Sequence, residues 1–429
     1  MTERPSAIVD ATRCAALAVA VAVTAAAHGQ APDRPRGIVM PRMRAPQASP
    51  APPAEAPALT AFAQDGSTVP FAGKDAPPDP GSVRAAFAVD ARETGSRDAG
   101  RMVLVLTDGQ RLVGSPATVA EGTAWVSPWS APRPMALEGV RAVILAGNRE
   151  PTATDEDVIE LRNGDRVTGV VTAVTVAAVQ VERSVDGTRT TVDLPLTDVA
   201  AIGLVGPAAA RSGMRAWIAD GTVVDAPRFE WMGVDHLVAP GVRGARTPSL
   251  TVPRRLVVAV QSSPDAVRPL ASLAVDAVPA PAAPGARESI ARPTVAPGTW
   301  PLGAAPIEIE GPAVFRFGSL DGPATFRATV RRPSVAMAAG SPDFVIRSAG
   351  REVLRERLGP RRPVTEVSVG LGAGPFEIEL SSADGSLPGN FAVLERAVLL
   401  PGAGAGIGAG PGMGSTPGSD VQPAPSQRQ

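Results

Sequence analysis

The sequence predicts an all-β chain in which three small β-barrel repeats precede a β-sandwich (jelly roll), with a disordered linker before them and a disordered tail after them. Asp-Gly or Asn-Gly turns recur at a regular interval between short apolar runs, which is the pattern of β-hairpins. The last third of the chain alternates apolar and polar residues with a period of two. No amphipathic stretch of helical period is long enough to predict a helix.

Composition limits the class of function. Apolar residues make up 44% of the 429 residues, aromatic residues only 3%, and there is no Tyr. The net charge of −1 does not direct the chain as a whole toward nucleic acid or an anionic membrane surface. We therefore expect a protein with aliphatic cores and no nucleic-acid partner.

Residues 1–29 are typical of a secretory signal peptide. Arg4 and Arg13 flank a short polar start, the apolar run from Cys14 to Ala27 follows, and small residues around Ala25 to Gly29 suit cleavage. The run is shorter than the ~20 apolar residues of a membrane-spanning helix, and an uncleaved anchor is the alternative. Cleavage would remove the only cysteine, so the mature chain would hold no disulfide and no thiolate metal site. We expect export to the periplasm, the cell surface or the extracellular space, with no membrane span in the mature chain.

Two segments have the composition of disordered chain. Residues 30–85 are rich in Pro and Ala, and residues 401–429 are rich in Gly, Pro and Ser. Such sequences cannot bury enough apolar surface to offset the entropy of ordering the chain. We expect a semi-extended linker and a disordered tail.

Three segments between them share one plan: an apolar strand, a turn, a second strand, and short strands that end in an apolar run. They are repeat 1 (86–148), repeat 2 (155–206) and repeat 3 (213–262). Their turn glycines, 55 and 57 residues apart, are Gly109, Gly164 and Gly221. Asp-Gly and Asn-Gly favour type I′ turns, in which both central residues have positive φ. Each repeat therefore predicts about five strands, enough for a small barrel that closes to remove its sheet edges.

Repeat 2 carries a family resemblance. Its hairpin GDRVTG and its closing run LPLTDVAAIGL (Leu194 to Leu204) resemble the small Sm-like barrels, of SH3-like type, found in bacterial envelope proteins. Sm-like domains elsewhere bind RNA, but these repeats lack a basic surface that carries aromatic residues. We expect structural spacers or modules that contact proteins.

Residues 264–400 predict the β-sandwich. Phe315 and Phe317 flank Arg316, and the same alternation recurs in the other apolar segments, as half-buried antiparallel strands require. Eight strand candidates follow one another: Leu270 to Val275, Ile307 to Gly311, Ala313 to Leu320, Ala324 to Arg332, Asp343 to Leu358, Thr365 to Leu371, Phe376 to Ser382 and Ala392 to Leu400. That number of short strands predicts a sandwich or jelly roll.

The order of motifs in this region resembles the NPCBM/NEW2 domain, a carbohydrate-binding module with a galactose-binding-like jelly-roll fold. The motifs are ATFRATV, DFVIRSAGREVLRERL, VSVGL, FEIELSSADG and AVLERAVLL, with GTWPLGAAPIEIEG ahead of them. The resemblance implies glycan binding. The His ahead of the FRATV strand and the terminal Asp and Trp that are usual in the family are absent here.

The candidate ligand-binding residues are Trp300, Asp384, Asn390 and Phe391. Sugar sites combine aromatic platforms with convergent polar groups, and Trp300 and Phe391 are the aromatic residues expected in loops. Asp384, Asn390 and Phe391 are the nearest equivalents of the family's terminal residues. Packing at a domain edge is the alternative role of both aromatic residues.

The sequence offers no catalytic, metal or cofactor site. His236 is the only histidine after residue 29, Lys74 is the only lysine, and no GxSxG motif occurs. The acidic run from Asp155 to Asp157 lacks the alternation of a calcium loop, so we expect it to face solvent. A glycosidase pair of carboxylates distant in sequence stays open. We expect no cofactor, no metal and no enzyme activity.

Two functions fit these observations. The first is an exported, non-catalytic binding protein of the bacterial cell envelope that holds a polysaccharide through its C-terminal β-sandwich. The alternative is a structural or scaffolding protein that contacts envelope proteins and has lost the sugar site. Direct binding to polysaccharide distinguishes the two, and nothing in the sequence indicates an oligomeric state.

Overall fold

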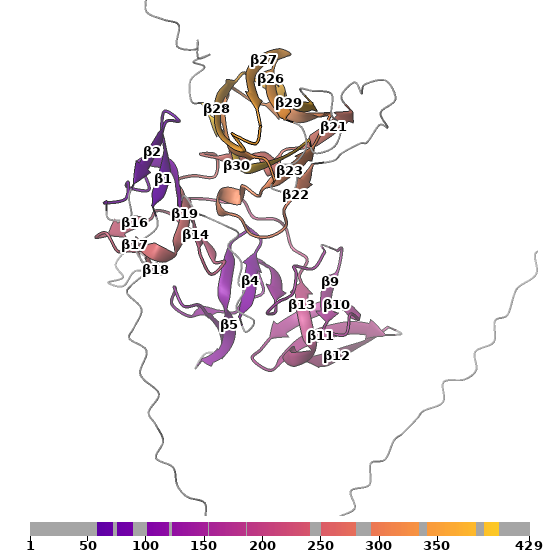
Figure 1. Cartoon of the computed structure of the whole chain (residues 1–429). Helices are drawn as coiled ribbons and strands as arrows, with labels where there is room; N and C mark the ends of the chain where they lie inside the picture. Colours follow the sequence, from indigo (N-terminus) through magenta and orange to yellow (C-terminus); the bar gives the residue numbers. More distant parts are fainter. Residues whose placement is uncertain are drawn as a thin grey trace, which may run out of the picture. The chain divides into compact units, whose positions relative to one another are not determined.

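The protein is all β in the computed structural model, apart from short 3-10 helices, so the predicted fold class is confirmed (Figure 1). The structure describes residues 58–71, 75–88, 101–119, 122–152, 154–185, 187–240, 250–279, 293–333, 341–382 and 390–402. All of them belong to the unit Ala54–Gln429. The predicted signal peptide, the first part of the predicted linker and the tail after residue 402 lie outside the described residues. No helix in the described ranges is long and apolar enough to cross a membrane.

The three repeats contain short strands that follow the predicted order. Repeat 1 has β4 (Met102–Leu106), β5 (Arg111–Val119), β6 (Gly122–Val126), β7 (Arg133–Pro134) and β8 (Val140–Ile144). Repeat 2 has β9 (Asp157–Leu161), β10 (Arg166–Val174), β11 (Ala178–Val185), β12 (Thr188–Pro195), the 3-10 helix η1 (Leu196–Asp198) and β13 (Val199–Gly203). Repeat 3 has β14 (Met214–Ile218), β15 (Val223–Ala226), β16 (Glu230–Met232), β17 (His236–Ala239), β18 (Leu250–Pro253), the 3-10 helix η2 (Arg254–Leu256) and β19 (Val257–Gln261). In each repeat the first strand lies between the last strand and the second: β8-β4-β5, β13-β9-β10 and β19-β14-β15.

The first hairpin turn has the same geometry in all three repeats. In repeat 2 the carbonyl of Leu161 accepts from the N–H of Gly164 at 2.9 Å, and the N–H of Leu161 donates to the carbonyl of Asp165 at 2.8 Å. Repeats 1 and 3 form the same two bonds around Gly109 and Gly221, and the three glycines have φ of 85°, 91° and 93°. The residue before each glycine does not have positive φ, so the expected type I′ turn is wrong. The turn is a three-residue loop, in which only the glycine occupies the left-handed region.

The expected closure of each repeat into its own barrel is also wrong for the described strands. The last strand of repeat 2, β13, pairs with the last strand of repeat 1, β8, and β15 of repeat 3 pairs with β5 at Val223 and Arg111. The repeats thereby join in a 16-stranded sheet, while β16, β17 and β18 form a separate three-stranded one. Pairing with neighbouring repeats covers the edges at β13, β8, β5 and β15 without closure of each repeat, whereas β12 of repeat 2 is the terminal strand of the sheet in the described structure.

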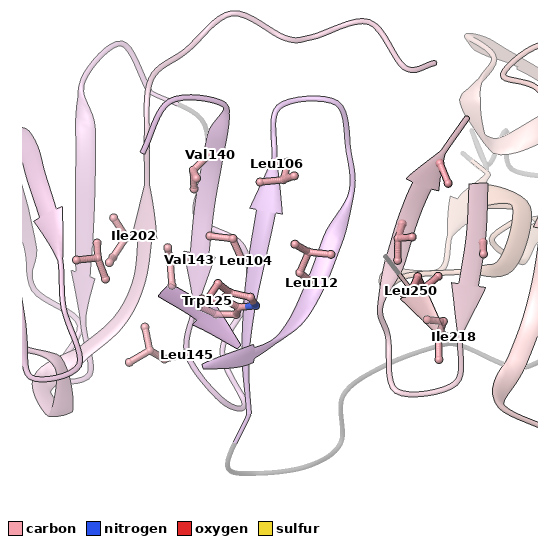
Figure 2. Packing of buried hydrophobic residues seen from close by; sticks show 14 of the residues in the cluster. Leu104, Leu106, Leu112, Trp125, Val140, Val143, Leu145, Ile202, Ile218 and Leu250 are labelled. Atoms are coloured by element: carbon pink, nitrogen blue, oxygen red, sulfur yellow. The ribbon is translucent and has the colours of Figure 1, made fainter. Parts of the chain in front are cut away.

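One apolar core runs through the repeats. Trp125 of repeat 1, Ile202 of repeat 2 and Ile218 of repeat 3 are buried in the same cluster, together with Leu104 and Leu250 (Figure 2). Most of its members are Val, Leu, Ile and Ala, as the low aromatic content predicts. Packing of these side chains joins the three repeats through residues that are distant in sequence.

The predicted linker is wrong in its second half, because three strands lie there. β1 (Leu59–Ala63), β2 (Thr68–Phe71) and β3 (Val83–Ala88) extend the large sheet, with β3 paired to β19. Phe62 and Phe87 are buried, and their ring centroids lie 5.1 Å apart. The apolar side chains within this Pro-rich stretch supply the burial that its average composition does not suggest.

The C-terminal region is a β-sandwich, as predicted. One sheet has the order β22-β23-β30-β25-β28, with β20 beside β30, and the other has the order β21-β24-β29-β26-β27. Their bounds are β20 (Arg268–Pro269), the 3-10 helix η3 (Leu270–Ser272), β21 (Val275–Pro279), β22 (Thr294–Val295), the 3-10 helix η4 (Pro301–Gly303), β23 (Ile307–Glu310), β24 (Ala313–Leu320), β25 (Ala324–Arg331), β26 (Pro342–Ser348), β27 (Arg351–Arg357), β28 (Val364–Leu371), β29 (Gly374–Ser382) and β30 (Phe391–Pro401). Side chains of both sheets form one core, which includes Phe315, Phe326, Phe344 and Phe376.

Two predicted strands of the sandwich differ from the structure. The segment Asp343 to Leu358 is a hairpin of β26 and β27, because Ala349 and Gly350 take positive φ of 49° and 74° in a two-residue turn. The segment Leu270 to Val275 begins as the 3-10 helix η3. The predicted alternation of buried apolar and exposed polar residues is confirmed in β24, where Phe315 and Phe317 are buried and Arg316 is exposed.

Candidate functional site

A pocket of about 710 Å³ lies between repeat 3 and the segments that lead into the sandwich. Repeat 3 and the residues just before it supply Arg211, Arg215, Trp217 and Gln261. The later segments supply Asp265, Arg268, Trp300, Leu302 and Asp321, and repeat 1 contributes Arg111. Small-molecule sites have volumes of about 300–1,000 Å³ and a few convergent polar groups, so this pocket has the size of a ligand site.

The base of the pocket is fixed by a buried ion pair between β14 and β15. Arg215 donates from Nε and Nη2 to the two carboxylate oxygens of Asp225, at 2.6 and 2.7 Å. Arg215 also donates to the carbonyl of Asp108 at 2.8 Å, and the N–H of Asp225 donates to Gln110 Oε1 at 3.0 Å. Two hydrogen bonds thereby attach the first turn of repeat 1 to repeat 3, and the one donated by Arg215 is charge-assisted, which makes it stronger than a neutral one.

Arg211 lies beside this pair with part of its hydrogen-bonding capacity unused. Its Nη1 donates to Gln261 Oε1 at 2.9 Å, and its guanidinium lies 5.9 Å from the centroid of the Trp217 ring. Within the described part of the chain, its Nε and Nη2 are buried and make no hydrogen bond, with Nε 4.0 Å from the nearest oxygen of Asp225. Burial and the neighbouring Arg215 lower the pKa of Arg211 to about 10, so the group stays protonated at neutral pH.

Trp300 is the one sequence-predicted site residue that the structure places in this pocket. Its half-buried indole donates from Nε1 to the carbonyl of Pro297 at 3.1 Å. Two residues on, Leu302 adopts a positive φ of 57° and is buried in a cluster with Trp217 and Leu400. The hydrogen bond and the buried leucine fix the loop that carries the indole.

The rim of the pocket carries exposed charges. Arg268 lies 4.0 Å from Asp321, whose side chain is fully exposed. Arg111 is half-buried and contacts Glu150 at 3.0 Å; Glu150 also contacts Arg141 at 2.6 Å, and neither Glu150 nor Arg141 lines this pocket. The exposed Arg268–Asp321 pair contributes little to stability, so its side chains are able to exchange partners at low cost.

The other candidate residues lie elsewhere. Phe391 begins β30, pairs with Glu310 of β23 and is 37% exposed, but it does not line this pocket. Asn390 is buried, and its carbonyl accepts from the N–H of Gly311 at 2.8 Å. Asp384 lies outside the described residues. The structure therefore does not bring Trp300 together with Phe391 or Asn390 in one pocket, and their roles in binding stay predictions.

Sequence reasoning missed the arginines. Nearly all cationic residues of this chain are Arg, so no single Arg stands out, and Arg111, Arg211 and Arg268 are far apart along the chain. The segment from Arg211 to Trp217 has no spacing typical of a binding motif. Only the pairing of strands that are distant in sequence brings these side chains together. No group of three or more His, Cys, Asp or Glu residues in the described ranges is arranged to hold a metal ion.

Comparisons with known proteins give partial similarity to carbohydrate-binding modules. No family model and no curated protein matches the chain. The CBM51 module of Clostridium perfringens GH95, in complex with methyl-galactose, is 15% identical with a TM-score of 0.21, over 22% of this chain and 69% of that one. The CBM51-2 and INT domains of Clostridium perfringens ZmpB, with GlcNAc, are 13% identical with a TM-score of 0.25, over 38% and 36%. The tandem CBM51 modules of a family 98 glycoside hydrolase from Streptococcus pneumoniae are 8% identical with a TM-score of 0.22, over 80% and 88%.

TM-scores of this size do not assign a ligand or a binding residue to this chain. The NPCBM/NEW2 and Sm-like resemblances therefore stay predictions, and the site is assigned from the residues that line the pocket.

Proposed function

We propose that this chain is an exported, non-catalytic binding protein of the bacterial cell envelope, and that it holds a glycan in the pocket around Trp300. The observation that carries the proposal is the pairing of a fixed, partly exposed indole with several guanidinium groups in one pocket of about 710 Å³. Sugars present apolar ring faces to indoles and hydroxyl groups to fixed hydrogen-bonding partners, so this arrangement suits them.

The absence of catalysis is part of the proposal. A glycosidase needs two carboxylates at the scissile bond, one of them kept protonated by a shielded environment. The acidic residues that line this pocket, Asp265 and Asp321, are both exposed. The pocket therefore presents mainly cations to its ligand, and neither acid has the shielded surroundings of a general acid.

Export is supported by the sequence of residues 1–29 alone, with its short apolar run between a charged start and small residues. It is tested by expressing the full chain with a C-terminal tag in a bacterial host and determining the N-terminal residue of the mature protein. Cleavage near residue 29 supports export. A cytoplasmic product that begins at Met1 contradicts it.

Glycan binding is tested with the purified protein on insoluble and soluble polysaccharides, peptidoglycan included. We expect saturable retention on at least one of them, and a loss of about tenfold or more in affinity for Trp300→Ala. Trp231→Ala is the matched control, because Trp231 is also half-buried and donates from its indole nitrogen to a backbone carbonyl, that of Pro78 at 3.0 Å, but does not line the pocket. Equal losses in both variants, or no retention on any polysaccharide by the folded protein, contradict the proposal and leave the scaffolding alternative.

A further inference from the structure

A second hollow adjoins the pocket around Trp300. It has a volume of about 570 Å³ and shares Arg111, Gly298 and Thr299 with the first pocket, so the two are contiguous. Arg101, Arg149 and Glu150 line it on the side of repeat 1. Together the two hollows form a groove, which we call the arginine groove, with room for more than a single small molecule.

Cations outnumber anions along the arginine groove. Its lining includes the six arginines Arg101, Arg111, Arg149, Arg211, Arg215 and Arg268, against the three acids Glu150, Asp265 and Asp321. Two acids outside the lining offset part of this charge: Asp225 pairs with Arg215, and Asp220 lies 3.9 Å from Arg101. This local excess contrasts with the net charge of −1 of the whole chain. A cleft lined mainly by one sign of charge concentrates ligands of the opposite sign.

The groove arginines are not all neutralised by the chain. Arg149 is exposed and has no ion-pair partner in the described part of the chain. Among the described residues, the one ion pair of Arg268 is the 4.0 Å contact with the fully exposed Asp321, and Glu150 is shared between Arg111 and Arg141. Arg211 adds a cation whose buried Nε and Nη2 make no hydrogen bond with the described residues, although its Nε lies 4.0 Å from Asp225.

We propose that the glycan bound in the arginine groove is an acidic polysaccharide, and that these arginines bind its carboxylates. The inference rests on the proposed glycan-binding function and names the class of its ligand. Guanidinium groups bind planar carboxylates through two parallel hydrogen bonds, and Arg215 already binds Asp225 in this way at the base of the pocket. A uronate chain presents such carboxylates at each sugar, along with ring faces for Trp300.

The groove fits a polysaccharide better than a nucleic acid. Channels for single-stranded nucleic acid stack successive bases on a series of aromatic side chains. The two hollows contain only the indoles of Trp217 and Trp300, and Trp217 is buried. The arginine groove therefore has several cations but, among the described residues that line it, a single half-buried aromatic platform, Trp300.

The test compares polygalacturonate with its fully methyl-esterified form, which has the same backbone without the charge. Binding of the purified protein is measured by calorimetry at low and at physiological salt. We expect the acidic form to bind about tenfold tighter or more, with an affinity that falls as salt rises. Arg149 and Arg268 are exposed, and one lies in each hollow. We expect Arg149→Gln and Arg268→Gln each to weaken binding about two- to fivefold. Arg189→Gln, which removes an exposed arginine of β12 far outside the groove lining, is the matched control and is expected to have no effect.

The remaining outcomes separate this inference from the proposed function. If the acidic and esterified forms bind equally well and Trp300→Ala abolishes the binding of both, the inference is wrong and the proposed function is supported. No binding of any polysaccharide overturns both. Equal or tighter binding of dextran sulfate or of a thymidine oligonucleotide shows attraction of polyanions in general, and it also overturns the assignment of a carboxylate ligand.

Discussion

Arg215 and Asp225 face each other across the β14–β15 hairpin and form a two-pronged ion pair that is about nine-tenths buried. Arg166 and Glu160 face each other in the same way across β9 and β10, at 2.8 Å, but Arg166 is largely exposed. The two pairs have the same register relationship but differ in burial and in the number of hydrogen bonds, two for Arg215–Asp225 and one for Arg166–Glu160. Their comparison therefore measures what burial and two-pronged geometry together add to a cross-strand ion pair in one protein.

We expect Asp225→Asn to lower the free energy of unfolding by about 3–5 kcal/mol, because it leaves Arg215 charged and buried without its partner. Glu160→Gln is expected to cost less than about 1 kcal/mol, as exposed pairs do. Urea denaturation at neutral pH measures both. A double variant, Arg215→Met with Asp225→Leu, is expected to recover most of the loss, and similar costs for Asp225→Asn and Glu160→Gln would contradict this account.

The backbone conformation of a glycine predicts how much its replacement by alanine lowers stability. Gly164 and Gly322 both have open space where a Cβ would be added, but only Gly164 has a positive φ, of 91°. We expect Gly164→Ala to destabilise the protein by about 1–2 kcal/mol, since an L-residue is strained in the left-handed region. Gly322→Ala is expected to be neutral or slightly stabilising. Thermal unfolding of both variants is the measurement, and an equal effect would show that backbone conformation does not set the cost.

The packing of Phe87 tests whether β1, β2 and β3 belong to the folded unit. Phe87 is buried against Phe62 and shares its cluster with Leu302 and Leu400, which come from the far end of the chain. Phe87→Ala is expected to cost about 3–5 kcal/mol, as for other buried Phe residues. Phe391→Ala, at an exposed Phe, is expected to cost less than about 1 kcal/mol in the absence of ligand. A Phe87→Ala protein with unchanged stability would show that these strands contribute no packing.

The sequence predicted the features that depend on near neighbours. The three turn glycines identified the repeats, and the alternation around Phe315 and Phe326 identified strands of the sandwich, because both patterns are local. Pairing between β13 and β8, or between β3 and β19, depends on contacts across long stretches of chain, and no local pattern specifies it. The average composition of residues 30–85 is dominated by Pro and Ala, so it did not indicate the few apolar residues whose burial stabilises β1 and β3.

The sequence predicted one residue of the candidate site. Trp300 was expected in a loop because it lies between two predicted strands, and the structure places it in the pocket. The groove arginines come from repeats 1 and 3, from the segments beside them that carry Arg149 and Arg211, and from the sandwich region, so their convergence follows from the sheet topology rather than from any spacing. The pocket is formed by residues that lie close together in space, and no one of them stands out in the sequence.

Gln261 connects the pocket to the fold and supports a last prediction. It is buried, donates from Nε2 to the carbonyls of Pro264 and Val267 at 3.2 and 3.1 Å, and accepts from Arg211. Gln261→Leu removes these bonds and leaves buried donors and acceptors unpaired, at a cost of about 1–3 kcal/mol for the unfolding free energy. It also frees Arg211 and the segment that carries Arg268, so we expect the affinity for the glycan to fall as well.

The neighbouring Ser262 gives the control, since its hydroxyl donates to the carbonyl of Arg84 at 3.0 Å and it does not line the pocket. Ser262→Ala is expected to lose some stability and to keep wild-type affinity at a temperature where both variants are folded. If Gln261→Leu binds the glycan as tightly as the wild type under these conditions, Gln261 does not position Arg211 for binding. A loss of affinity in Gln261→Leu alone indicates that the ligand depends on the geometry that this side chain imposes, and not on overall stability.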